Sequence, residues 1–219
     1  MDLTIAIFGA TGATGLLLTQ HCLAAGHNIQ VLARNPDRFP YSSRVMPGRV
    51  MLVRGDARDP LAVKQTLAGA DVVLSALGAR SLAKEDVLEI AVPHIVAAMD
   101  QLKIRRIIAL GSAGALPTSL DKQPAWRRWI VQNIVYKTAL KWPVNAQIAQ
   151  YAALSASDLD WTMVMPPMLT NGRARGTYRI DADALPRNAS SISRADVADF
   201  IFAQIDIPQW IRKGVYLGY

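Results

Sequence analysis

The chain has 219 residues, of which 51% are hydrophobic, and its formal net charge is +7. This composition excludes a disordered chain, and no apolar run of about 18 residues indicates a membrane span. The only cysteine, Cys22, excludes an intramolecular disulfide and a cysteine metal cluster. The basic residues are dispersed, so we expect a phosphate-bearing small molecule rather than nucleic acid to explain part of the charge. We expect a cytoplasmic protein without a bound metal, either a monomer or a homodimer.

The first predicted element is a buried strand, residues 4–8, and a glycine-rich turn follows it directly. Three glycines recur at every third position, and a leucine-rich helix that should stop at Gly26 comes next. In this order, free backbone N–H groups and the positive end of the helix dipole point at one place, which makes an anion site. The turn lacks the Gly-Lys-Ser/Thr ending of a nucleotide-hydrolysing loop, so a dinucleotide pyrophosphate is the predicted ligand. A purely structural turn is the alternative. The residues predicted to bind the cofactor here are Gly9, Thr11, Gly12, Ala13, Thr14 and Gly15.

Strands and helices alternate along the rest of the chain. Further strands are predicted in NIQVLAR, RVMLVRGDA, DVVLSALGA, RRIIALGSAGA, DWTMVMPP and GVYLGY. Helices are predicted after Asp59, over 86–101 with a kink or a new start at Pro93, over about 144–157, and after a Ser193 cap. This alternation predicts an α/β fold, a Rossmann-type doubly wound parallel sheet in a single domain spanning 1–219. From about 166 to 219 we expect a small C-terminal lobe that contributes to an acceptor pocket.

The end of the second strand indicates which dinucleotide is bound. An NAD site places an acidic residue there to accept the ribose 2′-hydroxyl. This chain has Arg34 at that position, with Arg38 one turn later. A guanidinium binds a 2′-phosphate through two parallel hydrogen bonds, so we predict that NADP(H) is preferred over NAD(H). A solvated arginine at a strand end is the alternative.

Residues 124–142 form a tryptophan-rich insert with helical spacing. Trp126, Trp129, Ile130 and Ile134 fall near one face of the predicted helix. Packing in the core or in a lid is the favoured interpretation, and a subunit contact or a membrane-surface contact remains open.

Several motifs together resemble the atypical short-chain dehydrogenase/reductase family, and within it the flavin reductase and biliverdin-IXβ reductase branch. They are IAIFGATGATG, VLARNPDR, RGDARD, DVVLSALGA, ALGSAGA and MVMPP, followed by GTYRI and ISRADVADF. The resemblance implies further cofactor-binding residues, namely Asp56 and Ala57 at the adenine, Leu77, Gly78 and Ala79 along the loop that passes under the ribose and pyrophosphate, and Pro166 at the nicotinamide. Arg80 follows that loop and is expected to close over the phosphates or to meet an acidic substrate, and a surface arginine is the alternative. It also implies that Ser112 is an active-site serine that binds the acceptor, together with Pro167 and Met168, and a serine that only forms a turn or cap is the alternative for Ser112. Related reductases can carry a histidine after the two prolines, and Met168 stands there instead, which argues against biliverdin.

The chemistry is constrained by a pair of residues that the sequence lacks. Typical short-chain dehydrogenases donate a proton from a tyrosine whose pKa is lowered by a lysine four residues on. Here Tyr136 is followed at that spacing by Leu140, and Tyr151 by Ser155. Flat conjugated acceptors such as flavins and quinones need no such donor, so we predict an NADPH-dependent reductase of acceptors of this type. A non-catalytic NADP(H)-binding sensor is the alternative, and an isomerase or epimerase is disfavoured because it needs the missing tyrosine.

Overall fold

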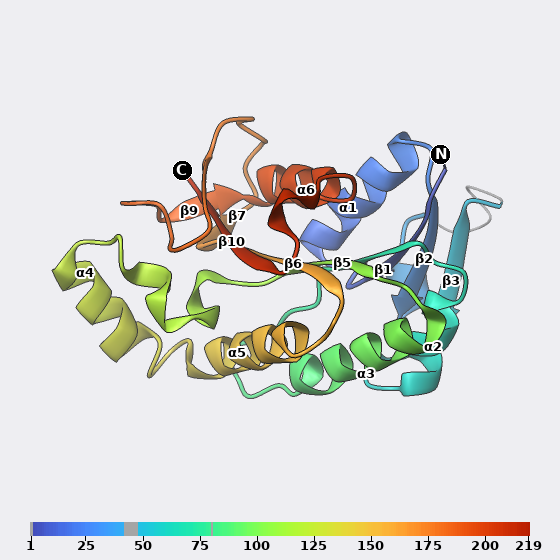
Figure 1. Cartoon of the computed structure of the whole chain (residues 1–219), viewed down its shortest axis with the longest axis horizontal. Coiled ribbons are helices and arrows are strands. Elements are labelled where there is room, and N and C mark those ends of the chain that lie inside the picture. Colours follow the sequence, from blue (N-terminus) through green and yellow to red (C-terminus); the bar gives the residue numbers. More distant parts are fainter. Residues whose placement is uncertain (1, 42–47, 80) are drawn as a thin grey trace.

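The computed structural model describes residues 2–41, 48–79 and 81–219 (Figure 1). The strands of the larger sheet are β1 (Thr4–Phe8), β2 (Asn28–Ala33), β3 (Val50–Arg54), β4 (Val72–Ser75), β5 (Arg106–Leu110), β6 (Asp160–Met165), β8 (Arg179–Asp181) and β10 (Lys213–Gly218). They are ordered β3-β2-β1-β4-β5-β6-β10-β8, and every neighbouring pair is parallel except β10 with β8. A second, two-stranded sheet pairs β7 (Met168–Thr170) with β9 (Ser191–Ser193). The predicted doubly wound α/β fold is confirmed.

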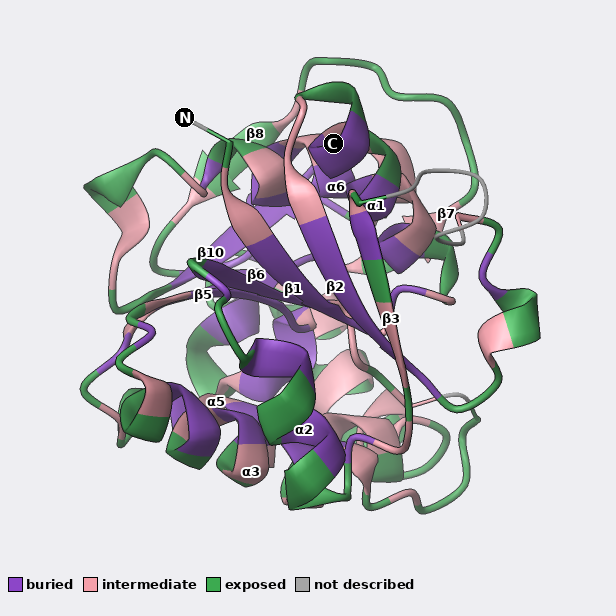
Figure 2. Cartoon of the chain, turned by 90° about the vertical axis from the view of Figure 1, so that its right-hand side faces the viewer, coloured by how far each residue is buried: buried purple, intermediate pink, exposed green. Residues whose placement is uncertain are grey.

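Helices cover both faces of the larger sheet. They are α1 (Ala13–Ala24), α2 (Pro60–Leu67), α3 (Val87–Leu102), α4 (Ala125–Ile130), α5 (Lys141–Ser155) and α6 (Arg194–Ala203). In Figure 2, α1 and α6 lie on one face, whereas α2, α3 and α5 lie on the other. Each face has its own apolar core, one around Ile7 and Leu18 and the other around Phe8 and Met99. Because both faces are covered, the central strands are apolar at nearly every position.

Helix ends follow the signals in the sequence. Asp59 caps α2 by accepting a hydrogen bond from the Leu61 N–H at 2.9 Å, and Ser193 caps α6 by accepting from the Asp196 N–H at 2.9 Å. Gly26, with φ of +88°, follows the end of α1 in a conformation that favours glycine. At Pro93 the sequence predicted either a kink or the start of the main helix, and the structure excludes the start. Helix α3 already begins at Val87 and continues through this proline.

The insert at 124–142 does not pack as a core helix. Helix α4 gives way to a π-helix, Val131–Val135, then to a turn, and α5 begins at Lys141. No residue of α4 or of the π-helix is buried, so the prediction of core packing for this face is wrong. The pattern was ambiguous because an amphipathic helix has the same spacing whether its apolar face meets a core or solvent.

Strands β7, β8 and β9 were not predicted. Each has only three residues, and each pairs with a strand well separated from it in sequence, which leaves no local pattern. Short 3₁₀ turns complete the structure at Pro36–Arg38, Ala113–Ala115, Pro117–Leu120 and Pro208–Trp210. In the part of the chain that the structure describes, no helix is long and apolar enough to cross a membrane.

Candidate cofactor-binding site

A cleft of about 750 Å³ opens beyond the carboxyl ends of β1, β2, β3 and β4. In open parallel sheets this edge is where ligands bind, because the loops that follow the strands meet there. Most of the residues proposed from the sequence for cofactor binding line this cleft. They are Gly9, Thr11, Gly12, Ala13, Thr14, Arg34, Asp56, Ala57, Leu77, Gly78 and Ala79.

Glycine is needed at each of the three positions of the first turn for a different structural reason. Gly9 has a φ of +78°, and a Cβ there would lie 2.5 Å from the carbonyl oxygen of Ala76. A Cβ on Gly15 would overlap the backbone of Gly9, so this residue brings α1 close to the strand rather than lining the cleft. A Cβ on Gly12 would meet only the Gly9 oxygen, at 3.3 Å. Gly12 is therefore the glycine whose missing side chain leaves space in the cleft itself.

The N-terminus of α1 is free to bind an anion. Gly12 is its N-cap residue and provides no side-chain cap. The first N–H groups of a helix have no partner within that helix, and Gly12, Ala13 and Thr14 line the cleft at this point. Together with the space left by the glycine, these groups fit a diphosphate, because they offer donors and a positive dipole end without a competing side chain.

A cluster of charged side chains lies at the carboxyl ends of β2 and β3. Arg58 donates to both carboxylate oxygens of Asp56 at 3.0 Å and to Asp86 at 2.9 Å. The Arg34 guanidinium is 3.8 Å from Asp56 and remains 42% exposed. The hydrogen bond from Arg58 lowers the pKa of Asp56 to about 2, with a smaller contribution from Arg34. Asp56 is thus ionised and largely neutralised by Arg58, which leaves Arg34 available to a ligand.

Sequence reasoning missed part of the lining. The additional residues are Phe8, Leu32, Gly55, Arg58, Ala76, Lys84, Glu85, Asp86, Val87 and Arg194. Arg58 had a local signal, since it lies two residues after Asp56 and its N–H donates to that carboxylate at 2.9 Å. Arg194 had no such signal in the sequence, because it begins α6 and reaches the cleft from a distant part of the chain. Its guanidinium donates to Asn171 Oδ1 at 2.6 Å.

The remaining predicted residues that the structure describes lie outside the cleft. Arg38 ends a 3₁₀ turn and is exposed outside the cleft, and Arg80 falls outside the described residues. Ser112 and Pro166 follow β5 and β6 and are brought close together, because the Ala113 N–H donates to the Pro166 carbonyl at 2.9 Å. Pro167 is half-buried, and Met168 is 67% exposed. None of these four acceptor-side residues lines the cleft.

Tyr136 lies close to this acceptor-side loop. A Cβ on Gly114 would be 3.4 Å from Cζ of the Tyr136 ring, so the ring packs over the turn that follows Ser112. Burial raises the pKa of Tyr136. The phenol is therefore protonated at neutral pH. Among the described residues, no group of three or more His, Cys, Asp or Glu side chains could hold a metal ion.

The fold and the glycine-lined cleft define a dinucleotide-binding protein of the Rossmann class. A family model described as NAD(P)H-binding matches residues 9–208. The chain belongs to this NAD(P)H-binding family, which confirms the prediction that it binds a nicotinamide dinucleotide through this fold.

Individual relatives are more distant. The chain is 24% identical to the reductase pytE of Aspergillus terreus, over 96% of this chain and 92% of that protein. Its structure is similar to that of a short-chain dehydrogenase/reductase from Veillonella parvula solved in complex with NADP, with 23% identity, a TM-score of 0.80 and coverage of 100% of this chain and 95% of the other. It is also similar to ChuY, an anaerobilin reductase from Escherichia coli O157:H7, with 21% identity, a TM-score of 0.80 and coverage of 98% and 96%.

Proposed function

We propose that the protein is an NADPH-dependent reductase that passes hydride to a flat conjugated acceptor of the flavin or quinone type. Membership of the NAD(P)H-binding family and the likeness to two proteins named as reductases support a redox role. The observation that carries the proposal is the cleft, in which an uncapped helix N-terminus and an available guanidinium line one continuous space.

In this proposal the first turn holds the pyrophosphate. Backbone N–H groups of Ala13 and Thr14 donate to it, Gly12 leaves the space that it fills, and Gly9 and Gly15 keep the turn tight against the strand. Asp56 and Ala57 contact the adenine, and the loop of Leu77, Gly78 and Ala79 supports the ribose and pyrophosphate. Arg80 is proposed to bind the phosphates of the cofactor.

The preference for NADPH rests on Arg34. An acidic side chain next to a 2′-phosphate would repel it, and Asp56 lies only 3.8 Å from Arg34. Arg58 offsets that charge by binding both oxygens of the carboxylate, so the net field at Arg34 favours an anion. Arg38 is a second, more exposed partner at most, because it lies outside the cleft.

The acceptor is proposed to bind at the junction of the cleft with the C-terminal lobe, residues 166–219. When bound, the nicotinamide supplies a hydride. Pro166 lies beside the nicotinamide, and Ser112 donates a hydrogen bond to the acceptor. Pro167 and the thioether of Met168 provide apolar contact for a planar ring system. No tyrosine with a tuned pKa is required, because a conjugated acceptor spreads the incoming charge and takes its proton from water.

The test is oxidation of NADPH followed at 340 nm with riboflavin, FMN and a panel of quinones, with NADH run in parallel. We expect turnover with at least one acceptor class and a higher kcat/KM for NADPH than for NADH. Tight NADPH binding without turnover on any acceptor would favour the alternative, a non-catalytic NADP(H) sensor, for which the missing tyrosine–lysine pair is the supporting observation.

A further inference from the structure

The tryptophan-rich insert forms an arm that projects from the body of the protein. We use the term arm for residues 124–142, which contain α4 and the π-helix. In Figure 1 the arm lies at one end of the molecule, with α4 at its outer edge. Trp126 is 68% exposed, Trp129 59%, Ile130 39% and Ile134 48%. Their spacing of three and four residues places them on one side of the arm, so its apolar side faces solvent.

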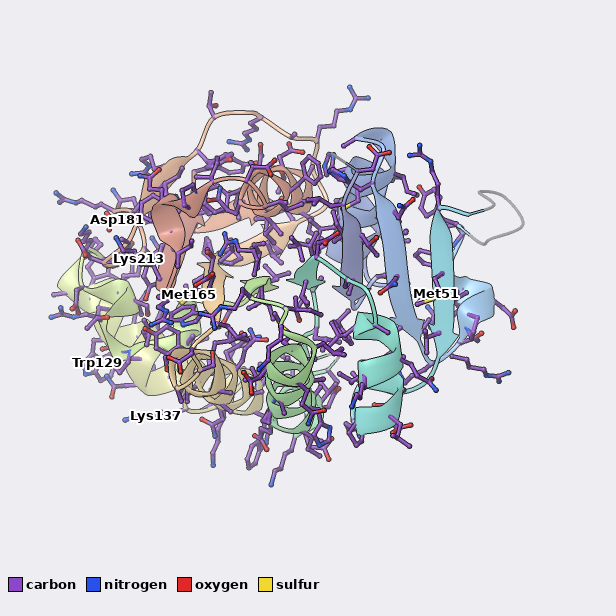
Figure 3. All side chains as sticks on the ribbon, turned by 45° about the vertical axis from the view of Figure 1, so that its right-hand side comes forward. Met51, Trp129, Lys137, Met165, Asp181 and Lys213 are labelled. Atoms are coloured by element: carbon purple, nitrogen blue, oxygen red, sulfur yellow. The ribbon has the colours of Figure 1, made fainter. Side chains whose placement is uncertain are left out.

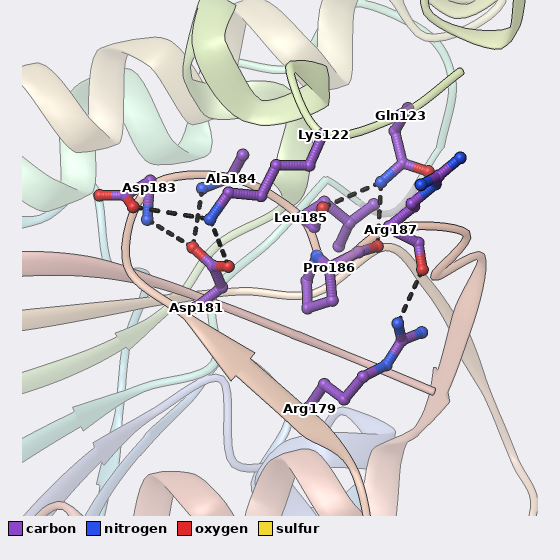
Figure 4. Close-up of polar contacts among 9 residues, drawn as sticks. All are labelled: Lys122, Gln123, Arg179, Asp181, Asp183, Ala184, Leu185, Pro186 and Arg187. Atoms are coloured by element: carbon purple, nitrogen blue, oxygen red, sulfur yellow. Dashed lines mark hydrogen bonds and ion pairs between the residues drawn. The ribbon is translucent and has the colours of Figure 1, made fainter.

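The base of the arm is fixed to the C-terminal part of the chain (Figure 4). Gln123 Nε2 donates to the carbonyls of Leu185 and Pro186, each at 2.9 Å. Lys122 pairs with Asp181 and Asp183, so its charge is compensated. Beyond these contacts, Arg127 donates to the Ala189 carbonyl at 3.1 Å. The arm is therefore held in place at its base, and its exposed apolar side is available to a binding partner.

The charge of the arm has a single sign. No Asp or Glu occurs from Lys122 through Ser157. The arm itself carries Arg127, Arg128, Lys137 and Lys141, and of these only Arg128 forms an ion pair within the described part of the chain, with Asp121 at 3.6 Å. Trp129 and Lys137 lie at the same outer edge of the molecule in Figure 3. Exposed tryptophans are thus accompanied by uncompensated cations.

This combination determines the kind of partner. A second copy of the chain would bring the same cations face to face, which opposes self-association through this surface. Tryptophan is enriched at membrane–water interfaces, and basic side chains bind the anionic headgroups there. We propose that the arm docks the protein on the surface of a membrane that contains anionic lipids. The tryptophans enter the headgroup region, and the protein is bound to the surface without spanning the bilayer.

The experiment measures binding of the full-length protein to vesicles by flotation. The vesicles contain either phosphatidylcholine alone or phosphatidylcholine with 30% phosphatidylglycerol. We expect binding to the anionic vesicles in low salt, about tenfold weaker binding in 0.5 M NaCl, and little binding to phosphatidylcholine alone. Trp126→Ser/Trp129→Ser should weaken binding by at least about tenfold, because the apolar contribution is removed.

Matched variants separate the arm from general surface effects. Met51→Ser/Leu61→Ser changes two exposed apolar residues far from the arm, on β3 and α2, and should bind vesicles like the wild type (Figures 1 and 3). Lys137→Glu/Lys141→Glu should weaken binding by about 25-fold or more, since each lost basic residue accounts for about fivefold. Lys64→Glu/Lys103→Glu makes the same change in net charge outside the arm and should have a clearly smaller effect. NADPH titration of each variant checks that it is folded.

Four results would overturn the proposal. The first is no binding to anionic vesicles in low salt. The second is equal binding by the arm variants and their matched controls. The third is a dimer in analytical ultracentrifugation that Trp126→Ser/Trp129→Ser dissociates, because a second copy would then cover the arm. Salt-sensitive binding of a mixed-sequence RNA or DNA duplex that exceeds vesicle binding would assign the surface to nucleic acid instead.

Discussion

The contacts within the cleft and those within the C-terminal lobe differ in how far apart in the sequence their residues lie. In the cleft, the first turn and the Asp56–Arg58 pair are built from residues close in sequence: the Gly12 N–H donates to the Gly9 carbonyl at 3.0 Å, and Arg58 binds Asp56. In the lobe, the Asp196 carboxylate accepts from the Arg175 and Gly176 N–H groups and from the Tyr219 hydroxyl, all 20 or more residues away. Local contacts leave a motif in the sequence, whereas distant contacts leave none.

The largest effect should come from filling the local part of the site. Gly12→Val should abolish NADPH binding, with a loss of at least about 100-fold, because the branched side chain occupies the space beside the helix N-terminus. The fold should survive, since Gly12 has an extended backbone, with φ of −83° and ψ of 164°, and a Cβ meets only one atom, at 3.3 Å. Calorimetric titration of the folded variant measures the loss. Binding equal to that of the wild type would contradict the assignment of the anion site.

Gly15→Ala provides the contrast. Its Cβ would overlap the Gly9 backbone, so this variant should lose stability in thermal unfolding as well as binding. If Gly12→Val were the one that unfolded while Gly15→Ala stayed stable, the structural roles given to the two glycines would be reversed.

The next prediction tests the choice of cofactor. Charge-assisted hydrogen bonds are worth roughly 1.5–3 kcal/mol each, so Arg34→Ala should weaken NADPH binding by about 10- to 150-fold. NADH lacks the 2′-phosphate and should be nearly unaffected, and the preference for NADPH should shrink with added salt. Arg54→Ala, at the end of the neighbouring strand β3 and outside the cleft, is the control and should change neither titration. Equal losses for both cofactors would mean that Arg34 supports the fold rather than binding a phosphate.

The third prediction concerns the lobe. Burial would raise the pKa of Asp196, but hydrogen bonds from Tyr219, Arg175, Ser193 and Gly176 lower it. A lowered pKa means that the carboxylate stabilises the folded state fully above its unfolded pKa of about 4 and loses this contribution as the pH falls below that value. Asp196→Asn should therefore reduce the free energy of unfolding by about 2–3 kcal/mol at pH 7.

Denaturant unfolding at several pH values measures this difference. Because only the wild type loses stability when Asp196 is protonated, the two proteins should become more similar in stability below about pH 4. Cofactor binding at pH 7 should change less than in Gly12→Val, since Asp196 holds the lobe and lies outside the cleft. A difference in stability that stays constant down to pH 2 would show that the charge of Asp196 is not what stabilises the lobe.

The difference between contacts of residues near in sequence and contacts of distant residues also explains what the sequence could and could not predict. The sheet, the caps at Asp59 and Ser193, and most of the cleft lining follow from spacing within about ten residues. Arg194 reaches the cleft from the start of α6, and short strands such as β8 depend on distant partners. The arm was misjudged for a different reason, because the periodicity of a helix describes which residues share a face and not what that face meets.

The smallest effect should come from Tyr136 and Tyr151, because neither has the lysine that would tune a proton donor. Neither Tyr136 nor Tyr151 has a lysine four residues on, and burial raises the pKa of Tyr136, so its phenol is a poor proton donor at neutral pH. Tyr136→Phe keeps the ring that packs over Gly114, and Tyr151→Phe keeps the edge-on contact with Trp161 at 5.5 Å between ring centres. Each variant should therefore reduce acceptors at a rate within about threefold of the wild type, measured as NADPH oxidation under saturating conditions. A fall of several orders of magnitude with NADPH binding intact would reveal a proton relay through Tyr136 or Tyr151. The acceptor would then need a strong donor, and the argument for a flavin or quinone from the missing lysine would fail.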